Sequence, residues 1–197
     1  HGLQPETEEA ARAAEATFWL LDGRYQKFMA KKITTNKYKT QQTLMKDLIT
    51  TLKELEQTLG QIHLTYKAYN WSVAAFFRIG MLWKHLAMVI TEMPPPPNLP
   101  IEVEEKYQIQ ISDFGVQFED KARAGWRTAV KNAKRLGISN DWTNRILVEL
   151  NKYPEDRLKY PLFKEEKQVY DPAPLLSSPY MLTADVPPAP VLPEAPP

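Results

Sequence analysis

The chain has 197 residues, of which 43% are hydrophobic and 25% charged, and its formal net charge is +1. These values are typical of a globular protein with a sizeable core, and the charge alone predicts no class of partner. The absence of cysteine excludes disulfide scaffolds, thiolate catalysis and cysteine-ligated metals. Because the chain begins at His1 without methionine, we expect a processed protein or a region of a longer one.

The first expected helix covers residues 5–33. Thr7 is the expected N-cap, because a threonine hydroxyl can accept a hydrogen bond from the first turn. Apolar side chains then recur about every 3.6 residues, which predicts one buried face. This face contains Ala10, Ala13, Ala14, Phe18, Leu21, Tyr25 and Phe28.

Residues 23–46 form a basic segment with seven Lys or Arg and no Asp or Glu. Its candidate partner-binding residues are Arg24, Lys27, Lys31, Lys32, Lys37 and Lys39. One interpretation is a solvated helix end followed by a polar loop. The other is contact with an acidic protein face, lipid head groups or a phosphate backbone. Nucleic acid is an unlikely partner, since nothing beyond interleaved aromatics supports it.

A second helix is expected over residues 40–69. Its apolar residues are spaced three and four apart, which predicts a narrow seam. The seam contains Leu44, Leu48, Leu52, Leu55, Leu59, Ile62 and Tyr66. We expect it to pack on the following helix, because a short connection favours antiparallel neighbours. A coiled-coil partner is the alternative.

Residues 70–93 form the most apolar stretch, with large side chains over more than one helical face. Arg78, Lys84 and His85 interrupt it, and a central Arg or Lys in a membrane span costs roughly 2.5–3.5 kcal/mol. We therefore predict a core helix, ended by the prolines of the loop 94–100.

The next expected helix, residues 101–136, has acidic residues at its start and basic residues at its end, as the helix dipole favours. Gly115 and Gly125 predict close helix contacts or a bend. Gly137 is the expected left-handed C-cap, and Ser139 or Asn140 the N-cap of a last helix over residues 141–151.

Residues 171–197 include nine prolines, a composition that favours polyproline II or disorder over a core. We expect a partner to hold this segment. The candidate anchors are Tyr180, Leu182, Val191 and Leu192.

Two short patterns resemble a tetratricopeptide repeat. Phe76, Ile79, Gly80 and Trp83 have the spacing of the first helix of that repeat, and Ala122, Trp126 and Ala129 that of the second. The small Gly80 would let another helix approach closely. Gly80 and Ala122 are 42 positions apart, whereas the family needs about twelve, so the repeat is split by an insertion.

Residues 44–161 more widely resemble the C-terminal region of bacterial tetratricopeptide-repeat proteins. Those proteins resemble components of myxobacterial-type cell-envelope machinery, including gliding-motility complexes. The matching positions are Trp71, Ala75, Arg78, Ile79, Gly80, Glu119, Asp120, Lys121, Ala122, Ala129, Gly137, Asn140, Trp142 and Thr143. Arg123, Gly125 and Trp126 depart from the usual residues. The resemblance implies a scaffold at the periplasm or outer membrane, with other subunits as partners.

No pattern for catalysis, metal or cofactor binding is found. His1, His63 and His85 have no spacing that sets two on one helix face, and His85 is expected to be a packing residue. The acidic pairs Glu104/Glu105 and Glu119/Asp120 are expected to form surface ion pairs. We therefore predict no catalytic residue, no metal and no cofactor. A catalytic role for His85 or an acidic pair is a rival hypothesis.

These observations predict an all-α protein: an antiparallel helical-hairpin bundle or tetratricopeptide-like solenoid with an extended proline-rich tail. Its expected parts are residues 1–39 (a helix and basic linker), 40–161 (the helical domain) and 162–197 (the tail). The expected core residues are Phe76, Ile79, Gly80, Trp83, Ala122, Trp126, Ala129 and Trp142. The expected function is a non-enzymatic scaffold or adaptor. The alternative is an anionic-surface module that uses residues 24–46.

Overall fold

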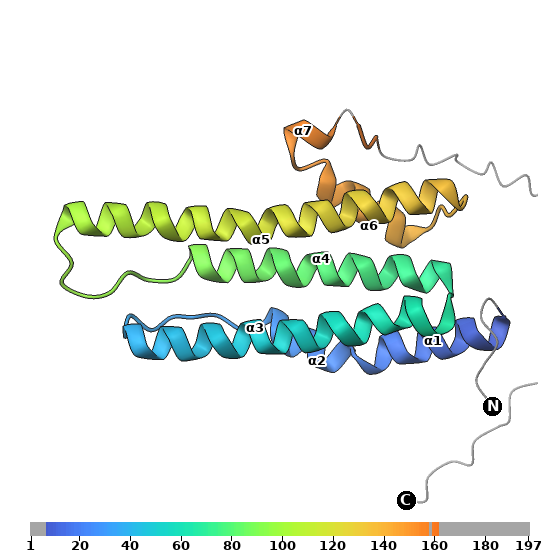
Figure 1. Ribbon diagram of the computed structural model, residues 1–197, viewed down its shortest axis with the longest axis horizontal. Coiled ribbons are helices and arrows are strands. Elements are labelled where there is room, and N and C mark those ends of the chain that lie inside the picture. Colours follow the sequence, from blue (N-terminus) through green and yellow to red (C-terminus); the bar gives the residue numbers. More distant parts are fainter. Residues whose placement is uncertain (1–6, 158, 162–197) are drawn as a thin grey trace, which may run out of the picture. The chain divides into compact units, whose positions relative to one another are not determined.

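The structure, a computed structural model, describes residues 7–157 and 159–161. These residues form helices joined by short connections, with no strand among them, so the predicted all-α class is confirmed (Figure 1). The elements are α1 (Glu8–Leu20), α2 (Asp22–Met29), α3 (Tyr38–Gln61), the π-helical turn η1 (Ile62–Tyr66), α4 (Tyr69–Thr91), α5 (Ile101–Arg135), α6 (Asp141–Leu150) and α7 (Pro154–Arg157). They belong to one compact unit. Tyr180, Leu182, Val191 and Leu192 lie outside the described residues.

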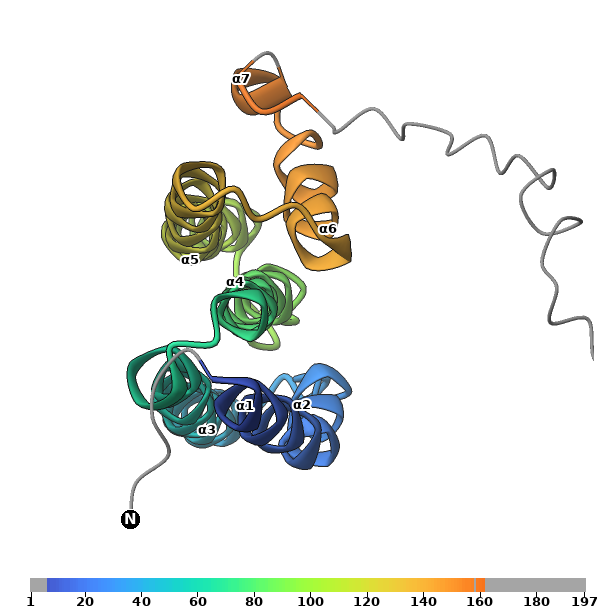
Figure 2. The ribbon, with the colours of Figure 1, turned by 90° about the vertical axis from the view of Figure 1, so that its right-hand side faces the viewer.

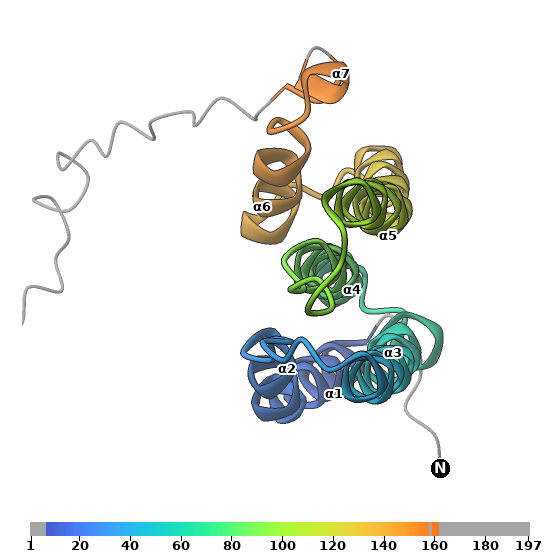
Figure 3. The ribbon, with the colours of Figure 1, turned by 90° about the vertical axis from the view of Figure 1, so that its left-hand side faces the viewer.

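Helix α4 lies in the middle of the unit. Seen end-on, it has α5 and α6 on one side and α1, α2 and α3 on the other (Figures 2 and 3). Successive long helices run in opposite directions, and the segment formed by α1 and α2 runs opposite to α3. Because α4 packs against helices on both sides, its sequence is apolar on more than one face.

In the part of the chain that the structure describes, α4 is the one helix long and apolar enough to cross a membrane by length and composition, with a mean hydropathy of 1.5. However, 67% of that apolar window is buried against the neighbouring helices. Arg78 and His85 are buried with it, each 4% exposed. The predicted core helix is therefore confirmed.

Helices α4 and α5 cross closely at two glycines. A Cβ atom at Gly80 would lie 2.1 Å from Nε1 of Trp126, and one at Gly115 would lie 2.4 Å from Cγ2 of Thr91. The close approach predicted at Gly80 is therefore confirmed. Gly125 differs, because a Cβ there would meet nothing within 4 Å.

The first expected helix is divided at Leu21 into α1 and α2, so the prediction of one helix over residues 5–33 is wrong. Thr7 caps α1 as predicted, accepting a hydrogen bond from the Ala10 N–H at 3.2 Å. At the other end, Nη1 of Arg78 donates to the Phe18 carbonyl at 3.0 Å. In a continuous helix, the same carbonyl would accept from the backbone N–H of the residue four positions later. A long-range contact therefore binds the last turn of α1 where the helix ends.

The predicted seam of α3 is buried from Leu48 to Ile62, but Leu44 is 37% exposed. Gln41, 2% exposed, takes the inward position in this part of the helix. Its Nε2 donates to the carbonyls of Thr35 at 2.8 Å and Pro94 at 2.7 Å. The helix also ends earlier than predicted, because Lys67 adopts a left-handed conformation (φ 49°).

The boundaries of the last helices agree closely with prediction. Gly137 has φ +67°, and Oδ1 of Asn140 accepts from the Thr143 N–H at 2.9 Å. Among the expected core residues, Trp126 is fully buried and Gly80, Trp83, Ala122 and Ala129 are buried. Phe76, Ile79 and Trp142 are half-buried and pack against this core.

Candidate binding groove

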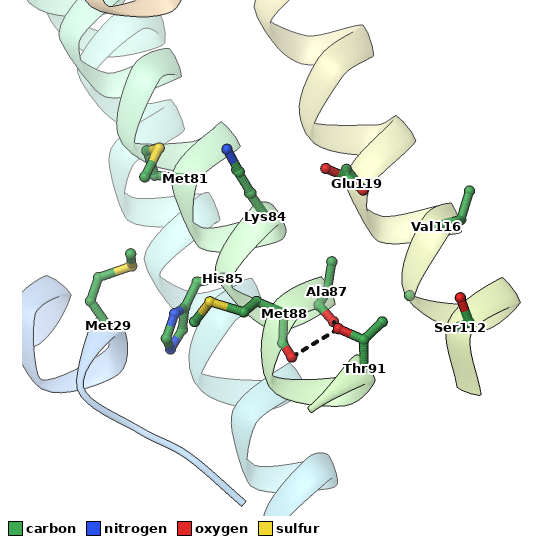
Figure 4. Close-up of a pocket in the computed structure, with 11 residues that line it drawn as sticks. Met29, Met81, Lys84, His85, Ala87, Met88, Thr91, Ser112, Val116 and Glu119 are labelled. Carbon is green, nitrogen blue, oxygen red and sulfur yellow. Dashed lines mark hydrogen bonds between the residues drawn. The ribbon is translucent and has the colours of Figure 1, made fainter. Parts of the chain in front are cut away.

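A groove lined by methionines crosses α4 between α2 and α5, and it encloses about 430 Å³ (Figure 4). Met81, Lys84, His85 and Met88 of α4 form its floor. One wall is Met29 of α2. The other is formed by α5 and includes Ser112, Gly115, Val116 and Glu119. We call it the methionine groove.

The methionine groove exposes apolar surface that the described chain does not cover. Met88 is 39% exposed and Val116 is 48% exposed. Methionine side chains are flexible and polarizable, so they adapt to partners of different shape. Contiguous exposed apolar surface of this kind is typical of an interaction site.

His85 fixes the α2 side of the groove. Its ring lies 5.6 Å from that of Phe28, and Nε2 lies 3.1 Å from the Lys31 carbonyl, so Nε2–H is the donor. Burial lowers the pKa of His85 below its usual 6.5, although the hydrogen bond to Lys31 opposes the shift. The imidazole is therefore neutral at pH 7, which confirms its expected packing environment.

The end of α6 and the residues after it bind side chains that line the groove. Glu149 of α6 accepts from Nζ of Lys84 at 2.7 Å. Just beyond α6, the Tyr153 hydroxyl donates to Glu119 at 2.5 Å. Burial would raise the pKa of Glu149, but hydrogen bonds from Lys152 and Lys84 outweigh it and lower the pKa. Glu149 is therefore a carboxylate at neutral pH, and Lys84 is already paired.

The six basic candidates do not all converge on one site. Arg24 pairs with Glu54 of α3 at 2.9 Å, so it faces α3. The other five, Lys27, Lys31, Lys32, Lys37 and Lys39, are exposed, and none makes an ion pair within the described residues. The Lys31 carbonyl binds His85 and the charge of Lys32 acts on it, so both residues lie near this side of the methionine groove, although neither lines it.

The structure brings together one histidine and serine pair that the sequence did not indicate. Nδ1 of His63 lies 3.1 Å from Oγ of Ser72, across the turn between η1 and α4. The Ser72 hydroxyl donates its proton to the Ala68 carbonyl, so the imidazole must donate to Ser72. This is the opposite of the proton transfer that activates a serine nucleophile. Within residues 7–157 and 159–161, no group of three His, Asp or Glu is placed to hold a metal.

A second hollow of about 500 Å³ lies on the other side of α4, between α3 and α5. Its lining includes Gln41 and Tyr107. Among the described residues, Oε1 of Gln41 and the Tyr107 hydroxyl have no hydrogen-bond partner. Burial raises the pKa of Tyr107. This hollow does not adjoin the surface on which α6 packs, so we take the methionine groove as the stronger candidate.

No protein-family model, curated protein or solved structure matches the chain. The functional argument therefore depends on the residues and geometry described above. Sequence reasoning did not find the methionine groove. Met81 and Met88 have a seven-residue spacing that places them on one helical face, but the other walls come from distant helices.

Proposed function

We propose that the protein is a non-enzymatic scaffold or adaptor subunit that binds another protein subunit. The observation that carries this proposal is the methionine groove, an apolar surface formed by three helices. Its charged and imidazole side chains are already engaged: Lys84 with Glu149, Glu119 with Tyr153, and His85 with Lys31. A surface with this composition suits protein binding better than proton or group transfer.

The arrangement of the helices supports a tetratricopeptide-like array as part of the proposal. The segment of α1 and α2 forms one hairpin with α3, and α4 forms another with α5. Helix α6 then has the place of the first helix of a third hairpin. The contact of Gly80 with Trp126 is the close helix approach that the resemblance implies. In such arrays, the helix faces that neighbours leave uncovered bind partners.

The proposed location is the bacterial cell envelope, at the periplasm or outer membrane, within a multi-subunit assembly. The support for it is the resemblance of residues 44–161 to envelope proteins. The proline-rich residues 162–197, with Tyr180, Leu182, Val191 and Leu192, are proposed as a second contact with subunits of that assembly.

Site-specific photo-crosslinking in the native cells tests the scaffold proposal. A photo-reactive amino acid would replace Met88 in the full-length protein, or Leu64 as a control, since Leu64 is 67% exposed and lies on η1. We expect a crosslinked protein of defined mass from position 88 and none from position 64. The same products from both positions, or none from either, would refute the groove as a partner site.

An anionic-surface module remains the second candidate function. It is favoured by the exposed candidates Lys27, Lys31, Lys32, Lys37 and Lys39, which make no ion pair with any residue that the structure describes. If it is correct, the protein should sediment with vesicles containing phosphatidylserine, because each basic residue near the surface contributes roughly 1 kcal/mol of attraction. Binding should then fall steeply between about 50 and 200 mM salt. Replacing Lys37 and Lys39 with Glu should then weaken binding. Salt-independent or absent sedimentation would exclude this function.

A further inference from the structure

We propose that the methionine groove binds an amphipathic helix of a partner protein, lying end to end with α6 and turning an acidic flank toward Lys31 and Lys32. This inference rests on the proposed scaffold function and specifies the partner. The groove continues the surface of α4 and α5 on which α6 already packs. Lys84 and Glu119 line the groove, and they also bind Glu149 at the end of α6 and Tyr153 just after it.

The lengths of the helices leave room for such a partner. The 23 residues of α4 span about 35 Å and the ten residues of α6 about 15 Å, at a rise of 1.5 Å per residue. Helix α6 packs on both α4 and α5. It therefore covers the part of their shared surface that precedes the groove along α4. The groove from Met81 to Thr91 continues for about 15 Å, the length of roughly three helical turns.

Helix α6 also shows which side chains fit this surface. Its buried residues include Thr143, Ile146, Leu147 and Leu150, which follow the i, i+3, i+4, i+7 pattern of a helix in a groove. Met29, Met81 and Met88 give the groove an apolar surface as well. We therefore expect the partner to present large aliphatic residues with the same spacing.

The charges beside the groove indicate which charge the partner helix should carry on its flank. On the α2 side, Lys31 and Lys32 are exposed and make no ion pair among the residues described. At the α6 end, Lys84 is paired with Glu149, and on the α5 side Glu119 accepts the Tyr153 hydroxyl. Lys31 and Lys32 outnumber Glu92, the one described carboxylate that acts on His85, so they favour a helix whose matching flank carries Asp or Glu.

Synthetic peptides test this inference on the full-length protein. Two helical peptides of about fourteen residues, near the length at which isolated helices are marginal in water, would carry the same leucine pattern. One would have a glutamate flank and the other a lysine flank. Fluorescence anisotropy should show the acidic peptide binding about tenfold more tightly, with the difference reduced by salt. Equal affinity for both peptides, or no binding of either, would overturn the inference.

Two variants place the peptide in the groove. Met88→Glu should weaken binding of the acidic peptide by at least about tenfold, which corresponds to 1.4 kcal/mol, whereas Leu64→Glu on η1 should not change it. Replacing Lys31 and Lys32 together with Glu should reverse the preference between the peptides. Circular dichroism would confirm that each variant is folded. Equal effects of Met88→Glu and Leu64→Glu, or an unchanged preference after the lysine replacement, would overturn the proposal.

The peptide result can be separated from the scaffold function itself. If photo-crosslinking at Met88 yields a defined partner but neither peptide binds, the scaffold function stands and the helical occupant is wrong. If a peptide binds and no partner is captured in cells, the groove accepts a helix but the scaffold function fails.

Discussion

The indole of Trp126 fills the space that a side chain at Gly80 would occupy. A Cβ built on Gly80 would lie 2.1 Å from Nε1 and 2.3 Å from Cε2 of Trp126. The same indole N–H donates to the Phe77 carbonyl at 3.3 Å, so the ring is tied to the backbone of α4. The crossing of α4 and α5 therefore depends on a glycine and a tryptophan together.

Gly80→Ala should destabilise the protein, although alanine is the better helix former. The added methyl group overlaps the indole ring, and overpacking of a core typically costs about 1–3 kcal/mol. Gly125→Ala is the matched control on the facing helix, where nothing lies within 4 Å. It should stabilise by about 0.5–1 kcal/mol. Denaturant unfolding of both variants measures the difference, and equal shifts would contradict the crossing described here.

Removing either central indole should unfold much of the domain. Trp126 is fully buried, and Trp83 stacks on Phe118 at 5.8 Å while its Nε1 donates to Glu56 at 2.9 Å. We expect Trp126→Ala and Trp83→Ala each to cost about 3–5 kcal/mol. Thermal unfolding followed by circular dichroism tests this. A fall of only one or two degrees in either variant would show that the ring is not part of the core.

Local sequence signals predicted the helices and their caps well. Thr7, Asn140 and Gly137 act within one turn of their own positions, so nearby residues are enough to identify them. The Gly80 pattern also predicted a close helix contact. In each case the information lies within a few residues, or in a spacing that a resemblance can match.

The features that were missed depend on partners far along the chain. Arg78 binds the last turn of α1 from a position 60 residues away. Gln41 takes the inward position in place of Leu44, and it binds the Pro94 carbonyl, 53 positions away. The methionine groove combines residues of α2, α4 and α5. Periodicity within one helix cannot show which distant polar groups will meet, or which apolar residues the chain will leave uncovered.

Loss of Asp22 should cost more than loss of Arg78. The Arg78 side chain is 5% exposed, lies 3.8 Å over the Phe18 ring and pairs with Asp22, whose side chain is 37% exposed. Asp22→Ala leaves a buried guanidinium without its counter-ion, and we expect a cost of about 3 kcal/mol. Arg78→Met keeps the volume and leaves a carboxylate that water can reach. Its cost should be about 1 kcal/mol, from the lost bond to the Phe18 carbonyl.

A double-mutant cycle with Asp22→Ala and Arg78→Met checks the origin of that difference. The double variant should be no less stable than Asp22→Ala alone, because the unpaired charge is removed with the arginine. Additive losses in the double variant would show that the two residues act separately.

His85 should make the stability of the protein depend on pH below its usual pKa. Burial lowers the pKa of folded His85 below 6.5, so the unfolded chain binds the proton more readily. Above about pH 6.5 both states are neutral and this residue adds no pH dependence. As the pH falls below 6.5, stability should decrease by at most about 1.4 kcal/mol per pH unit for one group. His85→Gln keeps an N–H donor for the Lys31 carbonyl, so its unfolding midpoint in urea should change less between pH 7 and 5 than that of the unmodified protein. An identical pH dependence in both proteins would show that His85 is protonated as easily in the folded chain as in the unfolded one.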